Sequence, residues 1–228
     1  MSAPNPVKDI DVLLMAAGTG ERFGKRKQFV DLAGQRVIKY SIDLLSGFNE
    51  ISRIIVVFPL DMDEREVKKL VPVHGTVFIR GEKERSNSVI NGLKEVTAPF
   101  VLIHDAVRPC CSEGTIRRVI DKMRKSGAAI PAVNPVSTVK ELDETGRYMT
   151  IDRENICLVQ TPQGFKTEEI MRAYKDKCVG SFTDSSSIAE EAGIYAEVVN
   201  GNRNNLKITY EDDWRYLEFI IENKRKNS

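Results

Sequence analysis

Short apolar runs alternate with amphipathic stretches along most of this chain, and few folds can bury such a pattern. Residues 54–58 form a β-branched run that Pro59 ends, which is typical of a strand buried on both faces. Residues 37–45 instead repeat their apolar side chains at helical spacing, with Ile38 and Ile42 one turn apart. Strands that alternate with helices predict an α/β fold, in which a mostly parallel sheet carries helices on both faces.

The same criteria locate the other elements. Further strands are predicted at residues 12–17, 77–79, 100–104 and 128–133. Further helices are predicted at residues 88–96, around residues 116–123, and from about residue 211 toward the C-terminus. Nothing in the sequence marks a linker or an internal repeat, so we expect one domain over residues 1–228.

The alternation breaks after Pro135. Residues 138–142 and 148–151 have the composition of strands, and they flank the turn-forming sequence Asp-Glu-Thr-Gly, which predicts a β-hairpin. We expect this hairpin, at about residues 135–153, to project from the domain as an arm. From its sequence alone it is an exposed hairpin with ordinary surface charges.

Composition limits the possible partners. The 34 Lys and Arg residues are balanced by 33 Asp and Glu residues, so we expect no nucleic-acid partner and no membrane partner. No apolar run approaches the ~20 residues that span a bilayer, and residues 1–6 lack the features of a signal peptide. The four cysteines have no Cys-x-x-Cys spacing, which favours free thiols in a cytoplasmic protein.

A glycine-rich loop follows the first predicted strand. Ala16, Ala17, Gly18 and Gly20 have small side chains, which let a ligand approach the backbone closely at the end of a strand. The backbone N–H groups of such a loop can hold a phosphate. The loop therefore indicates a nucleotide or phosphate site, although a plain strand-to-helix turn is the alternative.

Two known phosphate-binding fingerprints do not fit this loop. The dinucleotide pattern Gly-x-Gly-x-x-Gly requires a glycine where the chain has Phe23, which disfavours an NAD-dependent dehydrogenase. The P-loop pattern requires four residues between its glycines, but Gly18 and Gly24 enclose five. The ligand must therefore be held in another way.

Cations follow the loop directly. Arg22 and Lys27 flank it, so they could reach a triphosphate bound there. Lys25 and Arg26 are interpreted as solvated surface charges.

Further motifs follow in order along the chain. They are Lys27-Gln28-Phe29, Arg85-Ser86-Asn87-Ser88-Val89, His104-Asp105-Ala106-Val107-Arg108-Pro109, Thr161-Pro162-Gln163 and Asn205-Leu206-Lys207-Ile208-Thr209. Together with Ala-Ala-Gly-x-Gly-x-Arg after the first strand, this set resembles the 2-C-methyl-D-erythritol 4-phosphate cytidylyltransferases of the non-mevalonate isoprenoid pathway. The resemblance covers nearly the whole chain and implies a single Rossmann-like nucleotidyltransferase domain.

The resemblance implies a role for each matching position. The catalytic cations around the CTP phosphates would be Arg22 and Lys27. The nucleotide would lie against Ala16, Ala17, Gly18, Gly20, Gly81 and Ser88. The acceptor would lie against Asp105, Arg108, Thr161, Thr183 and Lys207, and its phosphate would face Lys207. Asp105 would also lie near Mg²⁺, which would be bound mainly through the CTP phosphates.

Two of these assignments have ordinary structural alternatives. Asp105 follows a predicted strand and could instead cap the start of a helix. Thr161 could simply end a strand before Pro162, and its assignment to the acceptor comes only from the resemblance.

The implied reaction joins the CMP part of CTP to 2-C-methyl-D-erythritol 4-phosphate and releases pyrophosphate. The resemblance also implies a homodimer with exchanged arms, in which Thr138 and Arg153 would complete the acceptor site of the neighbour. Ribitol-5-phosphate cytidylyltransferases share most of the motifs and give an alternative acceptor. A catalytically inactive nucleotide-binding paralogue is a further alternative, which the retention of the predicted charged residues disfavours.

Overall fold

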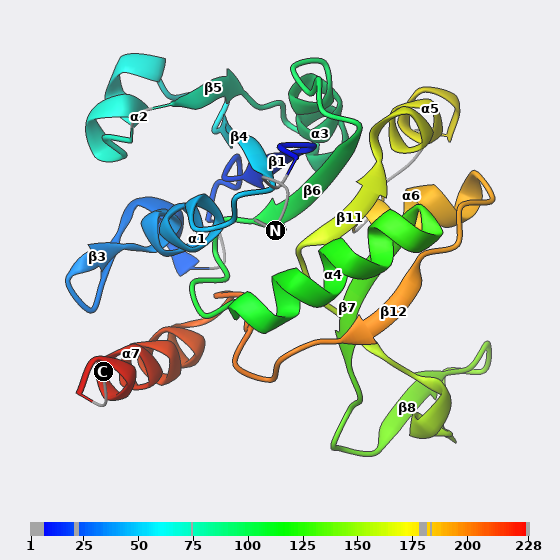
Figure 1. Cartoon of the computed structure of the whole chain (residues 1–228). Coiled ribbons are helices and arrows are strands. Elements are labelled where there is room, and N and C mark those ends of the chain that lie inside the picture. The colour runs from blue at the N-terminus through cyan, green and yellow to red at the C-terminus, as the bar shows by residue number, and fades with distance from the viewer. Residues whose placement is uncertain (1–6, 21–22, 74, 178–181, 183, 227–228) are drawn as a thin grey trace, which may run out of the picture.

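A mixed β-sheet runs through the centre of the molecule. The computed structural model describes residues 7–20, 23–73, 75–177, 182 and 184–226. Within these residues an eight-stranded sheet has the order β10-β7-β11-β6-β1-β4-β5, with β12 beside β7 (Figure 1). Its strands are β1 (Ile10–Met15), β4 (Ile51–Phe58), β5 (Thr76–Arg80), β6 (Phe100–Asp105), β7 (Ala128–Val133), β10 (Leu158–Val159), β11 (Gln163–Lys166) and β12 (Glu197–Asn200). Neighbouring strands are parallel except in the pairs formed by β10 and β11, which confirms the mostly parallel sheet.

Helices cover both faces of this sheet, as predicted. Side chains alternate along a strand, so Val12 and Leu14 of β1 face one side while Leu13 and Met15 face the other. On the first side pack α1 (Val37–Ser46), α2 (Glu64–Leu70) and α4 (Glu113–Ser126); on the second pack α3 (Arg85–Leu93), α5 (Thr167–Lys177) and α6 (Ser185–Glu191). Figure 1 shows α1 and α4 in front of the sheet. The sheet therefore has two buried faces, which explains its continuous apolar strands.

The structure changes the predicted elements in two places. Helix α3 begins at Arg85 rather than at residue 88, so it brings Arg85 to its first turn. Helix α2 was not predicted, because it has seven residues and buries only Val67. The local signal for α2 is instead at its start, where the Asp63 side chain accepts a hydrogen bond from the Arg65 N–H at 2.8 Å.

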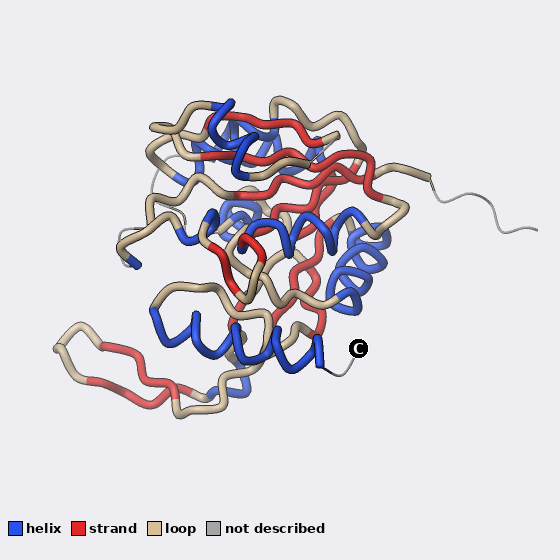
Figure 2. Tube along the Cα trace, turned by 90° about the vertical axis from the view of Figure 1, so that its left-hand side faces the viewer, coloured by secondary structure: helices blue, strands red, loops and turns tan. Residues whose placement is uncertain are grey.

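The predicted hairpin is present and projects from the body (Figure 2). Strands β8 (Val139–Leu142) and β9 (Tyr148–Ile151) pair antiparallel with each other. Between them the Asp143 carboxylate accepts hydrogen bonds from the backbone N–H groups of Thr145 at 2.9 Å and Arg147 at 2.8 Å. The short helix η3 (Arg153–Asn155) follows β9 and leads back to the sheet.

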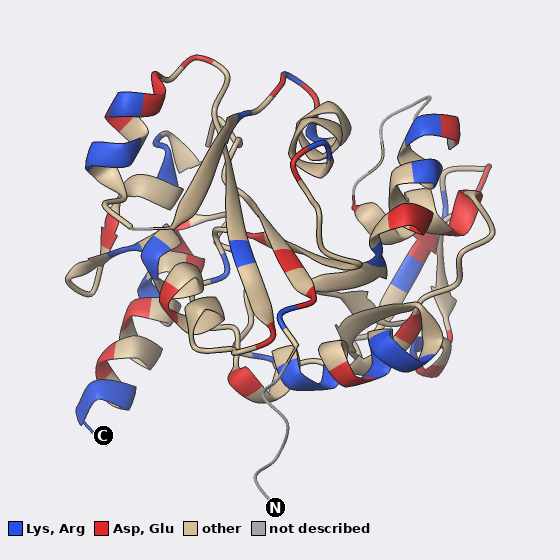
Figure 3. Cartoon of the chain, turned by 45° about the horizontal axis from the view of Figure 1, so that its top comes forward, with Lys and Arg blue, Asp and Glu red and all other residues tan. Residues whose placement is uncertain are grey.

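The last helix, α7 (Glu211–Lys226), packs against a third apolar cluster. Leu217 and Ile221 are buried there, together with Leu32 of the small hairpin formed by β2 (Asp31–Leu32) and β3 (Gln35–Arg36). The short helix η2 (Lys27–Phe29) precedes that hairpin. Figure 3 shows charges of both signs interspersed along α4 and α7. None of the described helices has the length and apolar character needed to cross a membrane.

Candidate active site

The candidate site lies where β1 and β6 end side by side. These parallel strands are in register, with Met15 of β1 opposite Asp105 of β6, so the glycine-rich loop after β1 begins next to Asp105. Gly81 joins them from the end of β5, since a Cβ atom on it would lie 2.6 Å from the Ala17 Cβ. Open parallel sheets bind ligands at the carboxyl ends of their strands, and three predicted segments meet at that edge here.

Gln28 holds the glycine-rich loop from its buried side. Its side-chain amide donates hydrogen bonds to the carbonyl oxygens of Ala16 at 2.7 Å and Gly18 at 2.8 Å. Gly20 turns the loop with a φ of 78°, and a Cβ atom there would lie only 2.0 Å from the Lys25 carbonyl oxygen. A Cβ atom on Gly18 would meet nothing within 4 Å, so the outer side of the loop is open. Gln28 belongs to the Lys27-Gln28-Phe29 motif, but this positioning role was not predicted from the sequence.

Gly81 and Ser88 form a second wall beside the loop. No side chain fits at Gly81, because the Ala17 Cβ would lie 2.6 Å away. The Ser88 hydroxyl accepts a hydrogen bond from the Glu82 N–H at 2.8 Å and lies 3.1 Å from the Glu84 carbonyl oxygen. The structure thus brings both predicted residues together, with Gly81 between Ala17 and the Ser88 hydroxyl. Their contact with a nucleotide stays a prediction.

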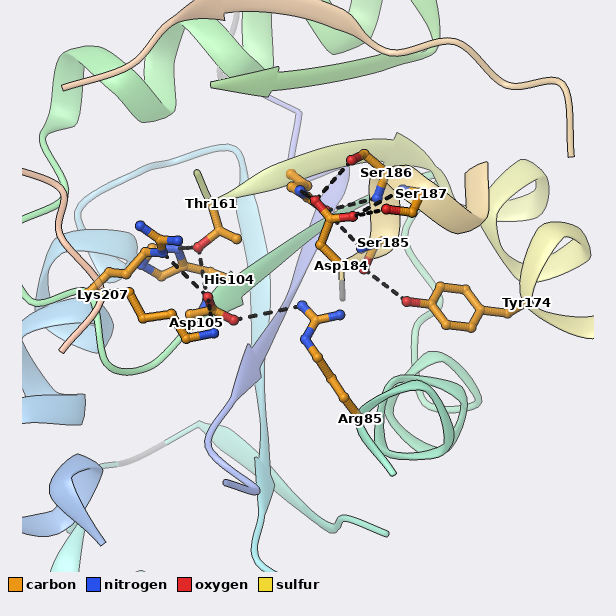
Figure 4. Close-up of polar contacts among 12 residues, drawn as sticks. Arg85, His104, Asp105, Thr161, Tyr174, Asp184, Ser185, Ser186, Ser187 and Lys207 are labelled. Atoms are coloured by element: carbon orange, nitrogen blue, oxygen red, sulfur yellow. Dashed lines mark hydrogen bonds and ion pairs between the residues drawn. The ribbon is translucent and has the colours of Figure 1, made fainter. Parts of the chain in front are cut away.

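Asp105 gathers three cations at the end of β6 (Figure 4). Its Oδ2 lies 3.1 Å from Lys207 Nζ and 3.4 Å from Arg108 Nε, and its Oδ1 lies 3.7 Å from Arg85 Nη2. Burial raises the pKa of Asp105, but the three cations together outweigh burial and hold it well below its usual range, so the carboxylate is ionised. Its interpretation as a helix cap is wrong, since Asp105 ends a strand and Ser112 caps α4.

Thr161 supports Asp105 from behind. The Asp105 N–H donates a hydrogen bond to Thr161 Oγ1 at 3.0 Å, and the same hydroxyl lies 2.8 Å from His104 Nδ1. Burial lowers the pKa of His104 to about 4, so this imidazole is neutral at neutral pH. The Asn205 side chain donates to the Thr161 carbonyl at 2.8 Å, and the Asn205 carbonyl accepts from Arg108 at 2.8 Å. The predicted residues Asp105, Arg108 and Thr161 therefore form one connected network.

A cavity of about 410 Å³ opens at this network. Its lining includes the three cations around Asp105, and it also includes Asp184 and Ser186 at the start of α6. The Asp184 carboxylate accepts hydrogen bonds from Gln163 Nε2 at 2.7 Å and from the Ser186 hydroxyl at 2.9 Å. Arg85 was not predicted as a site residue. Its motif was recognised, but a sequence does not reveal which residue of a helix faces a distant carboxylate.

The two predicted catalytic cations differ in what the structure describes. Arg22 lies outside the described residues. Lys27 begins η2 beside the glycine-rich loop, and its Nζ lies 5.9 Å from the centroid of the Phe23 ring. Lys27 thus flanks the loop, as predicted.

The predicted acceptor residues also divide into groups. Lys207 and Arg108 line the cavity, whereas Thr183 lies outside the described residues. Thr138 and Arg153 lie on the arm and do not line the cavity of their own chain. The Arg153 side chain instead donates a hydrogen bond to the Val136 carbonyl at 2.7 Å, within the arm.

The donor set around Asp105 suits anions better than a protein-held metal ion. Among the described residues, no group of three or more His, Cys, Asp or Glu side chains could hold a metal ion. Both oxygens of Asp105 face cations, and these cations would repel a metal ion bound to the same carboxylate. Divalent magnesium is usually held by one or two carboxylates together with substrate phosphates, so the site fits an ion carried mainly by a triphosphate.

Comparison with known sequences agrees with this geometry. A family model described as 2-C-methyl-D-erythritol 4-phosphate cytidylyltransferase matches residues 10–223. Curated proteins of that name from Endomicrobium trichonymphae and Syntrophus aciditrophicus are 37% and 39% identical to this chain. Each alignment covers 92% of this chain, and they cover 97% and 94% of the two relatives.

Solved structures give the same result. The crystal structure of 4-diphosphocytidyl-2C-methyl-D-erythritol synthase from Anaerococcus prevotii superposes with a TM-score of 0.83 at 29% identity, covering 94% of this chain and 96% of that one. The 2-C-methyl-D-erythritol 4-phosphate cytidylyltransferase of Thermus thermophilus has a TM-score of 0.78 at 28% identity, covering 93% and 98%. With a family model that matches nearly its whole length, this chain belongs to the 2-C-methyl-D-erythritol 4-phosphate cytidylyltransferase family.

Proposed function

We propose that this chain transfers CMP from CTP to 2-C-methyl-D-erythritol 4-phosphate, giving 4-diphosphocytidyl-2-C-methyl-D-erythritol and pyrophosphate. The observation that carries the proposal is the group of three cations around Asp105, directly beside an open glycine-rich loop. The loop supplies backbone groups and space for a nucleotide, and the cations supply a pocket for a second phosphate. Family membership supports the same reaction.

The chemical step brings two anions together. An oxygen of the acceptor phosphate attacks the α-phosphorus of CTP, and the bond from that phosphorus to the oxygen bridging to the β-phosphate breaks, so that pyrophosphate leaves. Catalysis of this kind depends on positioning and on stabilisation of charge. Lys27 beside the loop, with Arg22, would act on the triphosphate. Arg108, Lys207 and Arg85 would hold the acceptor phosphate.

The rest of the cavity suits a polyol. Burial raises the pKa of Asp184, but hydrogen bonds from Ser187 and Gln163 outweigh burial and lower it, and both carboxylate oxygens already accept hydrogen bonds within the protein. Glu190 also lines the cavity and is a further carboxylate for the hydroxyl groups of a substrate. Ser186 offers a second polar contact from the same helix. A substrate with a phosphate at one end and hydroxyls at the other matches these two parts of the cavity.

No covalent intermediate on a cysteine is needed or favoured. Burial raises the pKa of the Cys111 thiol to about 12 and also raises that of Cys110, so both stay protonated and weakly nucleophilic at neutral pH. Cys110, Cys111 and Cys157 are free thiols, which supports a cytoplasmic location.

Mg²⁺ would enter this site with CTP. Bound to the phosphates, it would neutralise part of their negative charge. Asp105 is the nearest candidate carboxylate, and its part in holding the ion stays a prediction, because its two oxygens already face cations.

The arm supports a homodimer. Leu142, Tyr148 and Met149 lie on its two strands and are 56%, 68% and 56% exposed, so the arm carries apolar surface that its own chain leaves uncovered. We propose that a second copy covers it and that Thr138 and Arg153 reach the neighbour's acceptor pocket. Lys27→Ala and Arg153→Ala proteins, each with strongly reduced turnover, should regain part of the activity when refolded together, because one mixed site receives both native residues. A monomer in sedimentation, or no recovery, would argue against shared sites.

The reaction itself is tested by pyrophosphate release from CTP and UTP with two acceptors, methylerythritol phosphate and ribitol 5-phosphate. We expect methylerythritol phosphate to be used at least tenfold more efficiently than ribitol 5-phosphate, because a pocket shaped around one methyl group gives ~1–3 kcal/mol of discrimination. CTP should be strongly preferred over UTP. A preference for ribitol 5-phosphate would reassign the acceptor, and no release with any pair would favour an inactive paralogue.

A further inference from the structure

We propose that Trp214 of α7 is a positioning residue, which holds the Lys27 side of the nucleotide loop in place through Phe23. The inference rests on the proposed function, because it assumes that Lys27 acts on the CTP phosphates. Trp214 belongs to none of the motifs that identified the site, and α7 begins about 190 residues after that loop in the sequence.

A chain of ring contacts links the helix to the catalytic cation. The rings of Phe23 and Trp214 have centroids 5.5 Å apart and planes tilted by 33°, within the range of favourable aromatic pairs. The Lys27 ammonium lies over the Phe23 ring, 5.9 Å from its centroid, which is within the range of a cation–π contact. Phe23 is thus placed between Trp214 and Lys27.

The loop and the helix that these ring contacts connect differ in rigidity. The loop turns at Gly20 and Gly24, both with positive φ, so its backbone has little intrinsic preference for one conformation. Helix α7 is fixed by buried Leu217 and Ile221. A rigid helix can therefore restrain a loop whose own sequence does not.

The start of α7 is also tied to the acceptor side. The Asp213 carboxylate, next to Trp214, accepts hydrogen bonds from the backbone N–H groups of Thr209 at 2.7 Å and Tyr210 at 2.8 Å. Ile208, beside Lys207, is buried in the apolar cluster on which Trp214 packs. Trp214 therefore packs on the same apolar cluster as Ile208, which is the neighbour of Lys207 in the acceptor pocket. By restraining Phe23, Trp214 keeps the nucleotide loop at a fixed distance from that pocket.

The test compares Trp214→Ala, Trp214→Phe and Phe219→Ala. Phe219 lies on the same helix and is 64% exposed, so its truncation is the matched control. For Trp214→Ala we expect kcat to fall about three- to tenfold, the amount that the loss of an aromatic pair implies, with the KM for the acceptor within about twofold. Trp214→Phe should retain most of the activity, and Phe219→Ala all of it. Thermal midpoints are measured alongside, so that turnover is expressed per folded molecule. Unchanged kcat for folded Trp214→Ala would overturn the inference.

Two further measurements separate positioning from a general structural role. In a Lys27→Ala background, Trp214→Ala should cause no additional loss of kcat; a loss of the same size in both backgrounds would overturn the inference. Trp214 is the only tryptophan, so its emission should change when CTP and Mg²⁺ are added without acceptor, and an unchanged emission at saturating CTP would count against a coupled loop. The wild-type protein is assayed in parallel: if it fails to release pyrophosphate with either acceptor, the proposed function is wrong, whereas normal wild-type turnover confines any failure to Trp214.

Discussion

Two buried aspartates lie at opposite ends of adjacent strands, and they serve different purposes. Asp11, near the start of β1, meets one cation, Arg53, at 2.6 Å and accepts backbone hydrogen bonds from Thr97 at 2.9 Å and Ala98 at 3.2 Å. Asp105, at the end of the neighbouring β6, meets three cations at 3.1 to 3.7 Å beside a cavity.

The difference lies in the balance of charge. The charge of Asp11 is matched by one guanidinium and by backbone donors, so this group is electrically satisfied and ties β1, β4 and the segment before β6 together. Around Asp105 one negative charge faces three positive ones, so this cluster carries a net positive charge, while Asp184 and Glu190 balance the charge of the cavity lining as a whole. Removing the charge of a matched buried carboxylate leaves its partner unpaired and destabilises the fold, whereas an outnumbered carboxylate leaves positive charge that attracts an anionic ligand.

The largest expected effect is on catalysis at Asp105. Asp105→Asn keeps the shape of the side chain and removes the charge that orders the three cations. We expect turnover to fall on the order of a hundredfold, about 3 kcal/mol in the barrier. The thermal midpoint should stay close to that of the wild type, because the Lys207 side chain is 41% exposed and can be hydrated, and the Arg85 contact is long, at 3.7 Å. Arg108 is only 11% exposed, but it keeps its hydrogen bond to the Asn205 carbonyl. Steady-state kinetics and a thermal melt measure the two quantities.

The contrast between Asp11 and Asp105 would be wrong if Asp105→Asn had a lower thermal midpoint than the wild type while its activity per folded molecule stayed normal. Asp105 would then be a structural residue like Asp11, and the cations would not depend on it for their arrangement.

Asp11→Asn should have the reverse phenotype. It leaves Arg53 without its partner, and breaking a buried pair costs several kcal/mol; because the Arg53 side chain is 33% exposed, we expect about 2–3 kcal/mol of lost unfolding free energy. Turnover per folded molecule should not change, since Asp11 lies at the far end of its strand. Denaturant unfolding measures the loss.

The exposed Asp61–Arg26 pair is the matched control for Asp11. The Asp61 side chain is 64% exposed, so Asp61→Asn should cost less than about 1 kcal/mol. An Asp11→Asn loss no larger than that of Asp61→Asn would mean that burial of the pair contributes little.

Much of the fold was predictable because its signals are local. The strand at residues 54–58 is buried on both faces and therefore apolar throughout, and the Asp-Glu-Thr-Gly turn encodes its own hairpin. The direction of β11 was not predictable, because only its pairing with β6 and β7 makes it antiparallel. Strand direction is a tertiary property that local composition does not record.

The site shows the same limit. Asp105, Arg108 and Lys207 were predicted from motifs, and the structure brings them together. Arg85 was missed because its partner lies 20 positions away on another element. Asp11 was also missed, although a charged residue at the edge of an apolar strand is a visible signal that it has buried partners.

The smallest expected effect sharpens the comparison through pH. Burial raises the pKa of Asp11, but Arg53 and the backbone donors outweigh burial, so the pKa in the folded protein lies below the ordinary value of 3.8. The unfolded chain therefore takes up a proton at a higher pH than the folded protein does. The stabilisation by ionised Asp11 is complete above the ordinary pKa of 3.8, and it is lost as the pH falls through the lower pKa of the folded protein. The unfolding free energies of the wild type and Asp11→Asn should differ by a constant amount at neutral pH and converge in acid. His104, with a pKa of about 4, titrates in both proteins, so their difference isolates Asp11. Parallel curves down to the acid limit would mean that the ionised form of Asp11 gives no extra stability, and the contrast with Asp105 would then rest on hydrogen bonding alone.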